Sequence, residues 1–130
     1  PRGLLWIETD DGAYTDTTNC MLLAAVPGNV GDGSATTIAS QSTFVGAPAT
    51  GDNLRRFLTG PVDCEITGIC MTPDNRAMFV NVQHPGERPS ERSDPADPDK
   101  YSTWPSGQPG ARPRSATVVI RKCDGGVIGT

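Results

Sequence analysis

Residues that could take part in chemistry gather at the two ends of one predicted β-hairpin, between positions 64 and 87. Glu65 lies at the start of its first strand, and His84, the only histidine, lies where its second strand stops. Carboxylates can bind metal ions, and a histidine can bind metal, bind phosphate as a cation or exchange a proton near neutral pH. The hairpin therefore predicts a site on the strand ends and loops of a β-scaffold.

His84 also has a second interpretation. Together with Gln83 it could hydrogen-bond the loop backbone and hold the end of the hairpin in shape, and we favour this supporting role over direct ligation. Glu87 is expected to be a loop partner. Arg114, which Pro113 partly fixes in direction, could bind phosphate oxygens with its planar guanidinium or pair with a neighbouring carboxylate. His84 and Arg114 are the candidate catalytic residues.

The elements that would position these residues are short strands separated by turns, with no convincing helix. Apolar runs rich in β-formers and closed by turn residues predict most of them. A tight turn at residues 73–76, Pro-Asp-Asn-Arg, joins the two strands of the hairpin. The expected strands are Leu4–Thr9, Cys20–Val26, Thr43–Val45, Leu54–Leu58, Ile66–Met71, Met78–Gln83 and Ala116–Arg121, with a short final one at Val127–Ile128.

A Pro-rich loop at residues 88–113 interrupts this pattern. Seven of the 12 prolines lie within it or just before it. Residues 91–100 are expected to form a mobile surface loop. Trp104, beside a proline, is expected to pack down and anchor the loop. Because the loop leaves the strand end at His84, it could cover whatever that strand end binds.

Composition restricts the class of protein. A chain of 130 residues with 35% hydrophobic and 20% charged residues fits one soluble globular domain. The 15 glycines and 12 prolines favour turns and short strands. A net charge of −4 argues against a nucleic-acid partner and against binding to anionic lipid. No apolar run approaches the roughly 20 residues that span a bilayer, so no membrane insertion is expected.

The four cysteines lack the spacing of a zinc site. Cys64 and Cys70 are expected on one face of a single strand, about 20 Å apart, whereas a disulfide needs Cα atoms within about 7 Å. We interpret the cysteines as small buried hydrophobic residues. A bridge from Cys20 or Cys123 to another strand stays open for an exported protein.

A weak internal repeat indicates a larger architecture. Residues 2–10 align by pattern with residues 75–83, each with a turn, apolar residues, an aromatic and a polar strand end. A recurring strand-turn-strand unit is typical of the four-stranded blades of a β-propeller. The expected fold is a single all-β domain over residues 1–130, with antiparallel sheets amounting to about two blades. Because the sequence enters a strand soon after Pro1, we expect it to be a segment of a longer protein.

Several motifs occur together along the chain. They are Cys64-Glu65-Ile66-Thr67-Gly68, Thr72-Pro73-Asp74, Met78-Phe79-Val80-Asn81-Val82-Gln83-His84-Pro85-Gly86-Glu87, Ser102-Thr103-Trp104-Pro105 and Pro113-Arg114-Ser115-Ala116-Thr117-Val118-Val119-Ile120, with Gly3-Leu4-Leu5-Trp6-Ile7 and Asp124-Gly125-Gly126-Val127-Ile128-Gly129 at the two ends. In this combination the chain closely resembles the C-terminal end of the PhoX alkaline phosphatase family. The resemblance runs from end to end and is weakest between Asp11 and Asn53. Residues 79–87 are its specific part, whereas Thr-Pro-Asp turns occur in many propellers.

The resemblance implies both a fold and an activity. Members of the family resemble six-bladed β-propellers, are exported to the bacterial periplasm by the twin-arginine route, and hydrolyse phosphate esters with an iron and calcium cluster in the central channel. It therefore implies a phosphate monoester substrate, calcium and iron as cofactors of the full-length protein, and a periplasmic or exported location. Much of that cluster, including a cysteine ligand of iron, belongs to the family's N-terminal part. The segment is thus expected to be inactive in isolation.

On the propeller pattern, Glu65 begins an inner strand and would face the channel, where calcium needs oxygen ligands. Glu65 is the first metal-ligand candidate, and capping of an exposed strand end is an equally weighted alternative. Asp10 is the second candidate, although adjacent acidic residues in a loop are usually just solvated. Without neighbouring blades, uncovered strand edges predict self-association.

Two other functions stay open at this stage. A propeller can serve as a non-catalytic binding or scaffold module, because fold does not fix function. A calcium-dependent lactonase-type propeller would also use inner-strand carboxylates.

Overall fold

Antiparallel β-strands make up all the regular secondary structure of the part of the chain that the structure describes. The computed structural model describes residues 3–10, 17–27, 33–46, 50–88 and 94–130. Its strands are β1 (Leu5–Glu8), β2 (Met21–Ala25), β3 (Ser34–Ile38), β4 (Gln41–Val45), β5 (Leu54–Thr59), β6 (Glu65–Met71), β7 (Met78–Gln83) and β8 (Ala116–Ile120). The prediction of an all-β fold with antiparallel sheets is therefore confirmed.

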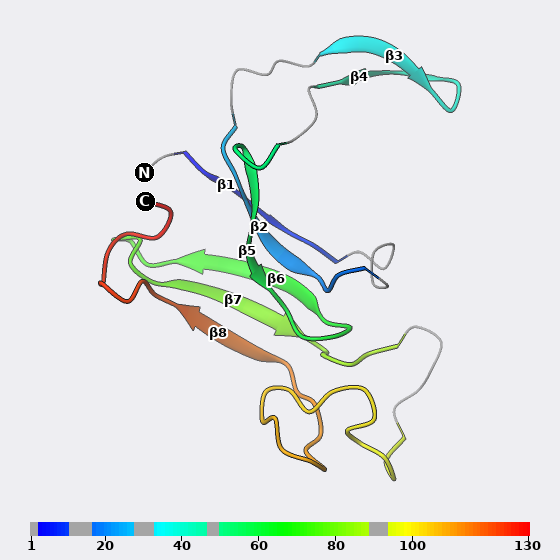
Figure 1. Cartoon of the computed structure of the whole chain (residues 1–130), viewed down its shortest axis with the longest axis vertical. Coiled ribbons are helices and arrows are strands. Elements are labelled where there is room, and N and C mark those ends of the chain that lie inside the picture. The colour runs from blue at the N-terminus through cyan, green and yellow to red at the C-terminus, as the bar shows by residue number, and fades with distance from the viewer. Residues whose placement is uncertain (1–2, 11–16, 28–32, 47–49, 89–93) are drawn as a thin grey trace.

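The strands form three separate sheets. One has the order β1-β2-β5, a second has the order β6-β7-β8, and β3 pairs with β4 alone. In Figure 1 the β3–β4 hairpin extends away from the other two sheets, and β6, β7 and β8 lie side by side. The two three-stranded sheets carry the core, and the β3–β4 hairpin is an excursion of the chain between β2 and β5.

Two details of the strand prediction are wrong. β3 was not expected, because Ser34–Ile38 is rich in small and polar residues and is exposed at every position, so it lacks an alternating apolar signal. Val127–Ile128 is not a strand. Ile128 is buried in the core at 3% exposure, but its N–H bonds to the Asn75 carbonyl of a turn rather than to a neighbouring strand.

The β6–β7 hairpin has the predicted turn. Asp74 Oδ1 accepts hydrogen bonds from Thr72 Oγ1 at 2.6 Å and from the Arg76 N–H at 3.1 Å. Asn75 adopts a positive φ of 56°, a conformation that asparagine tolerates better than most residues. The Thr72 N–H bonds to the Ala77 carbonyl at 2.9 Å and closes the turn.

A bulge in β6 changes which side chains face the core. The pairing of β6 with β7 shifts between Thr67 and Cys70, where Gly68 has a φ of 65°. A bulge adds one residue to one strand and so reverses the alternation of faces beyond it. Cys64 is consequently buried and Cys70 exposed. The expectation that they share a face is wrong.

The core lies between the two three-stranded sheets. Half of its buried side chains belong to β6 and β7, and the flanking Trp6 and Leu58 come from β1 and β5. Trp6 also meets Phe57 edge-on, with ring centroids 4.8 Å apart. The buried residues are Cys20, Leu22, Cys64, Ile66, Met78, Val80, Val82 and Ile128.

Trp104 anchors the Pro-rich loop, as predicted. Its side chain packs against the core cluster, and its carbonyl accepts a hydrogen bond from the Arg114 N–H at 3.1 Å. The Gly110 N–H also bonds to Asp99 Oδ2 at 2.7 Å within the loop. Residues 89–93 of the 88–113 loop, and with them part of the stretch expected to be mobile, lie outside the described residues.

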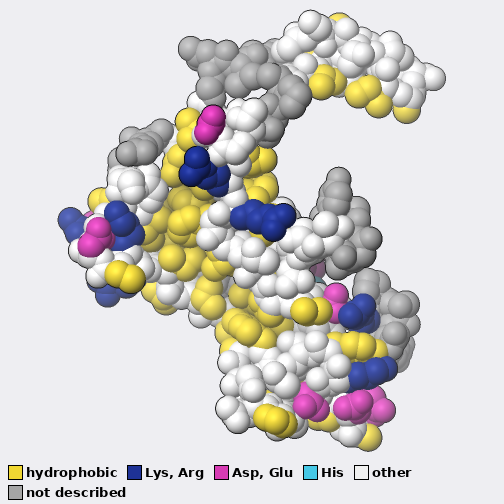
Figure 2. All heavy atoms as spheres, viewed as in Figure 1, with side chains coloured by type: hydrophobic (Ala, Val, Ile, Leu, Met, Phe, Trp, Pro, Cys, Tyr) yellow, Lys and Arg dark blue, Asp and Glu magenta, His cyan; other side chains and the backbone are white. Residues whose placement is uncertain are grey.

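Large hydrophobic side chains remain on the surface. Phe44 of β4 is 67% exposed, Val119 of β8 is 55% exposed, and Phe79 of β7 is 36% exposed. Figure 2 shows hydrophobic side chains gathered across the middle of one face and along the β3–β4 hairpin. The described residues include no helix with the length and apolarity needed to cross a membrane.

Only two of the four cysteines behave as buried hydrophobic residues. Cys20 and Cys64 are buried, whereas Cys70 and Cys123 are exposed, and all four are free thiols. Burial, reinforced by the neighbouring Cys20, raises the pKa of the Cys64 thiol to about 11. Cys64 is therefore protonated at neutral pH in the reduced protein.

Gly60→Ala tests the packing beside the two buried cysteines. A Cβ at residue 60 would overlap Cys64 Sγ and lie 2.8 Å from Ile66 Cδ1, inside the core. Overpacking of this kind costs about 1–3 kcal/mol, so the free energy of unfolding should fall by that amount in urea titrations. Gly51→Ala is the control, because a Cβ there meets nothing within 4 Å. Equal effects of the two substitutions would contradict this packing.

Asp74→Asn tests the turn of the hairpin through pH. The hydrogen bond from Thr72 and that from the Arg76 N–H hold the pKa of Asp74 below its ordinary value of 3.8. A lowered carboxyl pKa stabilises the folded protein above that ordinary value, and the effect disappears as the pH falls through the lowered pKa. In thermal unfolding, the Tm of the wild type should exceed that of Asp74→Asn at neutral pH, and the difference in Tm should disappear in acid. A difference that widens in acid would be inconsistent with this role.

Candidate functional site

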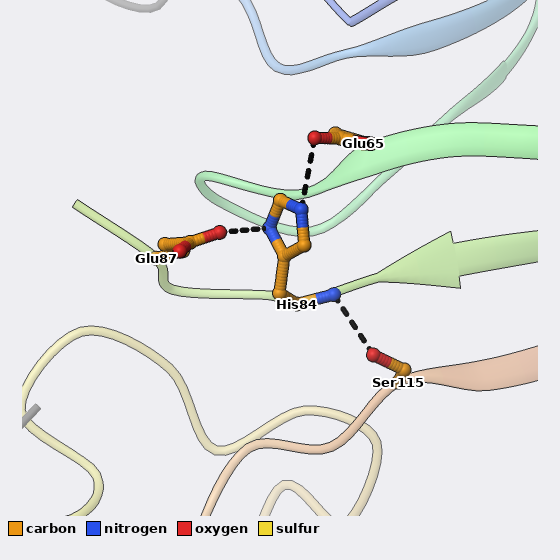
Figure 3. A network of polar contacts seen from close by, with 4 residues as sticks. All are labelled: Glu65, His84, Glu87 and Ser115. Atoms are coloured by element: carbon orange, nitrogen blue, oxygen red, sulfur yellow. Dashed lines mark hydrogen bonds and ion pairs between the residues drawn. The ribbon is translucent and has the colours of Figure 1, made fainter. Parts of the chain in front are cut away.

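The polar ends of β6 and β7 lie together because of their register. Glu65 at the start of β6 pairs with Gln83 at the end of β7, and His84 follows directly. His84 turns the chain with a positive φ of 30°, and its N–H donates to Ser115 Oγ at 2.9 Å, just before β8. Figure 3 shows the imidazole at the end of β7, lying between the side chains of Glu65 and Glu87.

The His84 imidazole contacts two carboxylates. Its Nε2 lies 2.9 Å from Glu65 Oε1 in a hydrogen bond, and its Nδ1 lies 2.6 Å from Glu87 Oε2. The second contact is close but misaligned, and Nδ1 has no hydrogen-bond partner of good geometry. It is therefore a close polar contact rather than a well-formed hydrogen bond. An imidazolium can serve both carboxylates, since both its nitrogens carry protons.

The loop after His84 is held from two sides. The Glu87 N–H bonds back to the His84 carbonyl at 3.1 Å, and the Gly86 N–H bonds to the Val62 carbonyl at 2.8 Å. Gly86 has a φ of 80°, and a Cβ there would lie 2.8 Å from Ser102 Cβ, so glycine is required for this close approach. The turn thus places Glu87 beside Nδ1 of the imidazole, while Glu65 of β6 lies beside Nε2.

An ion pair supports the same end of the sheet. Arg88 Nε lies 2.7 Å from Asp63 Oδ2, and the Asp63 side chain is only 12% exposed. The guanidinium of Arg88 also lies over the Tyr101 ring, 5.1 Å from its centroid. Residues just before β6, just after β7 and inside the Pro-rich loop are thus joined around the candidate site.

An open hollow of about 270 Å³ borders the imidazole. It combines the positive charge of Arg112 with the negative charges of Glu87 and Asp94, so its lining carries charges of both signs beside three prolines. The lining residues are His84, Pro85, Gly86, Glu87, Asp94, Pro98, Arg112 and Pro113.

The structure brings some of the sequence-predicted residues together and leaves others apart. Glu65 and His84 meet directly, and Glu87 is the loop partner expected of it. Arg114 is exposed, and its backbone rather than its guanidinium makes the contact with Trp104, while Arg112 lines the hollow. Asp10 is exposed beyond the end of β1.

Sequence reasoning did not single out Ser115, Arg112 or Glu8. Ser115 directly follows Arg114, so the entrance of β8 was the right place but the hydroxyl was overlooked. Arg112 is separated from Arg114 only by Pro113, and the path of the Pro-rich loop decides which arginine reaches the hollow. Glu8 could have been found from the sequence, because it is an acidic residue near the end of the first predicted strand, two residues before Asp10.

The described residues offer a cation some ligands but not a complete site. Glu8 Oε1 is buried and lacks a hydrogen-bond partner, which fits an oxygen that awaits a cation. The Thr9 carbonyl accepts the Ile66 N–H at 3.3 Å, so the end of β1 lies beside the start of β6 where Glu65 stands. However, no three His, Cys, Asp or Glu side chains of the described part converge as a metal-binding group.

Comparison with known proteins identifies the family of the chain. The family model of alkaline phosphatase PhoX matches residues 1–86. A solved structure titled "Pseudomonas fluorescens PhoX in complex with vanadate, a transition state analogue" matches 98% of the chain with a TM-score of 0.64 and 32% sequence identity. No curated protein gives a significant match.

The chain is short relative to that solved structure, since the match covers 17% of the Pseudomonas protein. Within this length the sheets of the chain follow a β-propeller-like fold, as the repeat predicted. The resemblance inferred from the motifs is confirmed by the family match over residues 1–86 and by the structural match. The chain belongs to the PhoX alkaline phosphatase family.

Proposed function

We propose that this chain is the C-terminal portion of a metal-dependent phosphatase that hydrolyses phosphate monoesters. The observation that carries the proposal is His84 held between Glu65 and Glu87 at the strand ends, in a chain of the PhoX family. The related Pseudomonas protein has been solved in complex with vanadate, a transition state analogue. On this proposal the full-length protein uses calcium and iron and works in the periplasm or outside the cell.

In this role Glu65 is a calcium ligand. Calcium takes six to eight oxygen ligands, and carboxylates are the strongest protein donors among them. His84 Nε2 occupies Glu65 Oε1 at 2.9 Å, and a carboxylate has a second oxygen to offer a cation. His84 then acts as a positioning residue, because a hydrogen bond of this kind fixes the direction of a ligating carboxylate. When bound, the cations would stabilise the charge that develops on the phosphate oxygens.

The orphan oxygen of Glu8 supports the same assignment. A buried carboxylate oxygen without a partner costs free energy unless something compensates it. Its strand ends beside the start of β6, where Glu65 stands. Two carboxylates remain far fewer than the six to eight ligands calcium needs. We therefore expect the isolated segment to have no phosphatase activity.

The Glu65 and His84 roles can be separated by substitution in the full-length protein. Glu65→Gln should lower bound calcium, measured by elemental analysis, together with the rate of p-nitrophenyl phosphate hydrolysis. His84→Gln should retain the ligand but lower calcium affinity by about 10- to 100-fold, as is typical when the partner of a metal ligand is removed. Added calcium should therefore restore the hydrolysis rate of His84→Gln more than that of Glu65→Gln.

Asp52→Asn is the matched control, because the Asp52 side chain is 99% exposed. It should change neither calcium content nor hydrolysis. Unchanged calcium in both Glu65→Gln and His84→Gln would favour a non-catalytic propeller. Hydrolysis of lactones but not of phosphate esters by the wild type would instead indicate a lactonase-type enzyme.

The isolated segment should self-associate. β8 is an edge strand of its sheet, and Val119 on it is 55% exposed beside Phe79 of β7. An open edge with apolar side chains pairs readily with a second chain. Light scattering of the isolated segment should show dimers or larger species at micromolar concentration. Val119→Thr, which keeps the β-branched shape, should shift the distribution toward monomer. A strictly monomeric wild-type segment would contradict the expectation.

A further inference from the structure

Two buried cysteines each directly precede a strand of one of the two main sheets. Cys20 directly precedes β2, and Cys64 directly precedes β6. Their exposed fractions are 8% and 4%, and both side chains belong to the same core cluster. Neither contributes a hydrogen bond or an ion pair to the candidate site.

Gly60 shows how close the two residues lie. Its N–H donates to the Cys20 carbonyl at 2.9 Å, and its own carbonyl accepts the Asn19 side-chain amide at 2.9 Å. A Cβ on Gly60 would lie 3.3 Å from the Cys20 carbonyl oxygen and would overlap Cys64 Sγ. Both cysteines therefore contact the same small volume, which glycine leaves open for a sulfur atom.

We propose that Cys20 and Cys64 form a disulfide in the mature protein, joining the sheet β1-β2-β5 to the sheet β6-β7-β8. The two sheets already meet at this point, because the Thr9 carbonyl beside β2 accepts the Ile66 N–H of β6. The bridge thus links neighbouring backbone segments that are fixed by hydrogen bonds. It would stabilise the fold chiefly by constraining the unfolded chain between residues 20 and 64.

The chemistry is ordinary thiol–disulfide exchange with a small-molecule disulfide as oxidant, for example oxidised glutathione. One cysteine thiolate attacks a sulfur of the oxidant, releases one reduced thiol and leaves a mixed disulfide. The second thiolate then attacks the protein sulfur of that mixed disulfide and releases a second reduced thiol. The two cysteines lose two protons and two electrons in total, and the oxidant takes them up.

The other two cysteines are not placed to compete. The bulge at Gly68 directs Cys70 to the outer face of β6, where it is exposed. Cys123 is exposed in the turn after β8. A disulfide requires Cα atoms within about 7 Å. Cys64, the other buried cysteine at the junction of the two sheets, is therefore the partner proposed for Cys20.

The bridge would also bear on the candidate site, although its formation does not depend on phosphatase activity. Cys64 is bonded directly to Glu65, whose carboxylate holds the imidazole of His84. Fixing residue 64 to the start of β2 would restrict movement of the first residue of β6. The position of Glu65 relative to β1 and β2 would then be set covalently.

The test uses the full-length protein carrying Cys70→Ser and Cys123→Ser, so that exposed thiols of this region cannot react. The protein is folded with a mixture of oxidised and reduced glutathione, denatured, and treated with an alkylating reagent. Trypsin cleaves at Arg55 and Arg56, between the two cysteines, and mass spectrometry without reduction identifies linked peptides. The expected result is a Cys20–Cys64 peptide pair that disappears on reduction, with neither cysteine alkylated.

Cys20→Ser in the same background is the matched control. It should leave Cys64 open to alkylation and remove the oxidant-dependent rise in Tm that the parent variant shows. Alkylation of both Cys20 and Cys64 after folding in the oxidant would overturn the proposal. A disulfide from either residue to a different cysteine would overturn it as well. Phosphatase activity enters none of these readouts, so the result is independent of the proposed function.

Discussion

The register of β6 against β7 is the constraint on which the rest of the structure depends. Pairing of Glu65 with Gln83 sets the polar end of the hairpin, and pairing of Met71 with Met78 sets the turn. Between them, Met78, Val80 and Val82 all face the core. A slip by one residue would turn these side chains to the surface and separate Glu65 from His84, because strand side chains alternate with a period of two. Core and candidate site are therefore fixed by one set of backbone hydrogen bonds.

The Gly68 bulge lets β6 bury side chains at even positions before it and at odd positions after it. Before it, Cys64 and Ile66 face the core, and beyond it Ile69 and Met71 pack against the same core from odd-numbered positions. The amide of Asn81 covers Gly68 where a Cβ would stand, so a larger residue would have to displace that amide and adopt a strained positive φ. Sequence alone does not reveal this feature, since it depends on what the partner strand presents.

The sequence predictions succeeded where a feature depends on residues close together in the chain and failed where it depends on distant contacts. The β6–β7 hairpin was predictable because its strands alternate, its turn residues have clear preferences, and its two polar ends are adjacent whenever the hairpin forms. The sequence therefore predicted Glu65 and His84 at the strand ends of the hairpin, although it did not predict their direct contact. β3 was missed because nothing buries it, and Ile128 was misassigned because apolar character alone does not distinguish a strand from a buried segment of irregular chain. Arg112 and Ser115 depend on the path of the Pro-rich loop, which no short-range pattern specifies.

The distribution of polar contacts explains why His84 can be both well ordered and incomplete as a site. Ser115 holds its backbone from β8, Glu65 holds Nε2 from β6, and Glu87 lies against Nδ1 from the following turn. Each contact comes from a different segment, so the imidazole direction is fixed by the fold rather than by a ligand. The carboxylates around it are too few to satisfy a calcium ion, and Glu8 Oε1, at the end of β1 in the other main sheet, also lacks a hydrogen-bond partner. On the proposed function, this end of the hairpin is one wall of a larger cation site, which orients Glu65 firmly and supplies only part of the ligands.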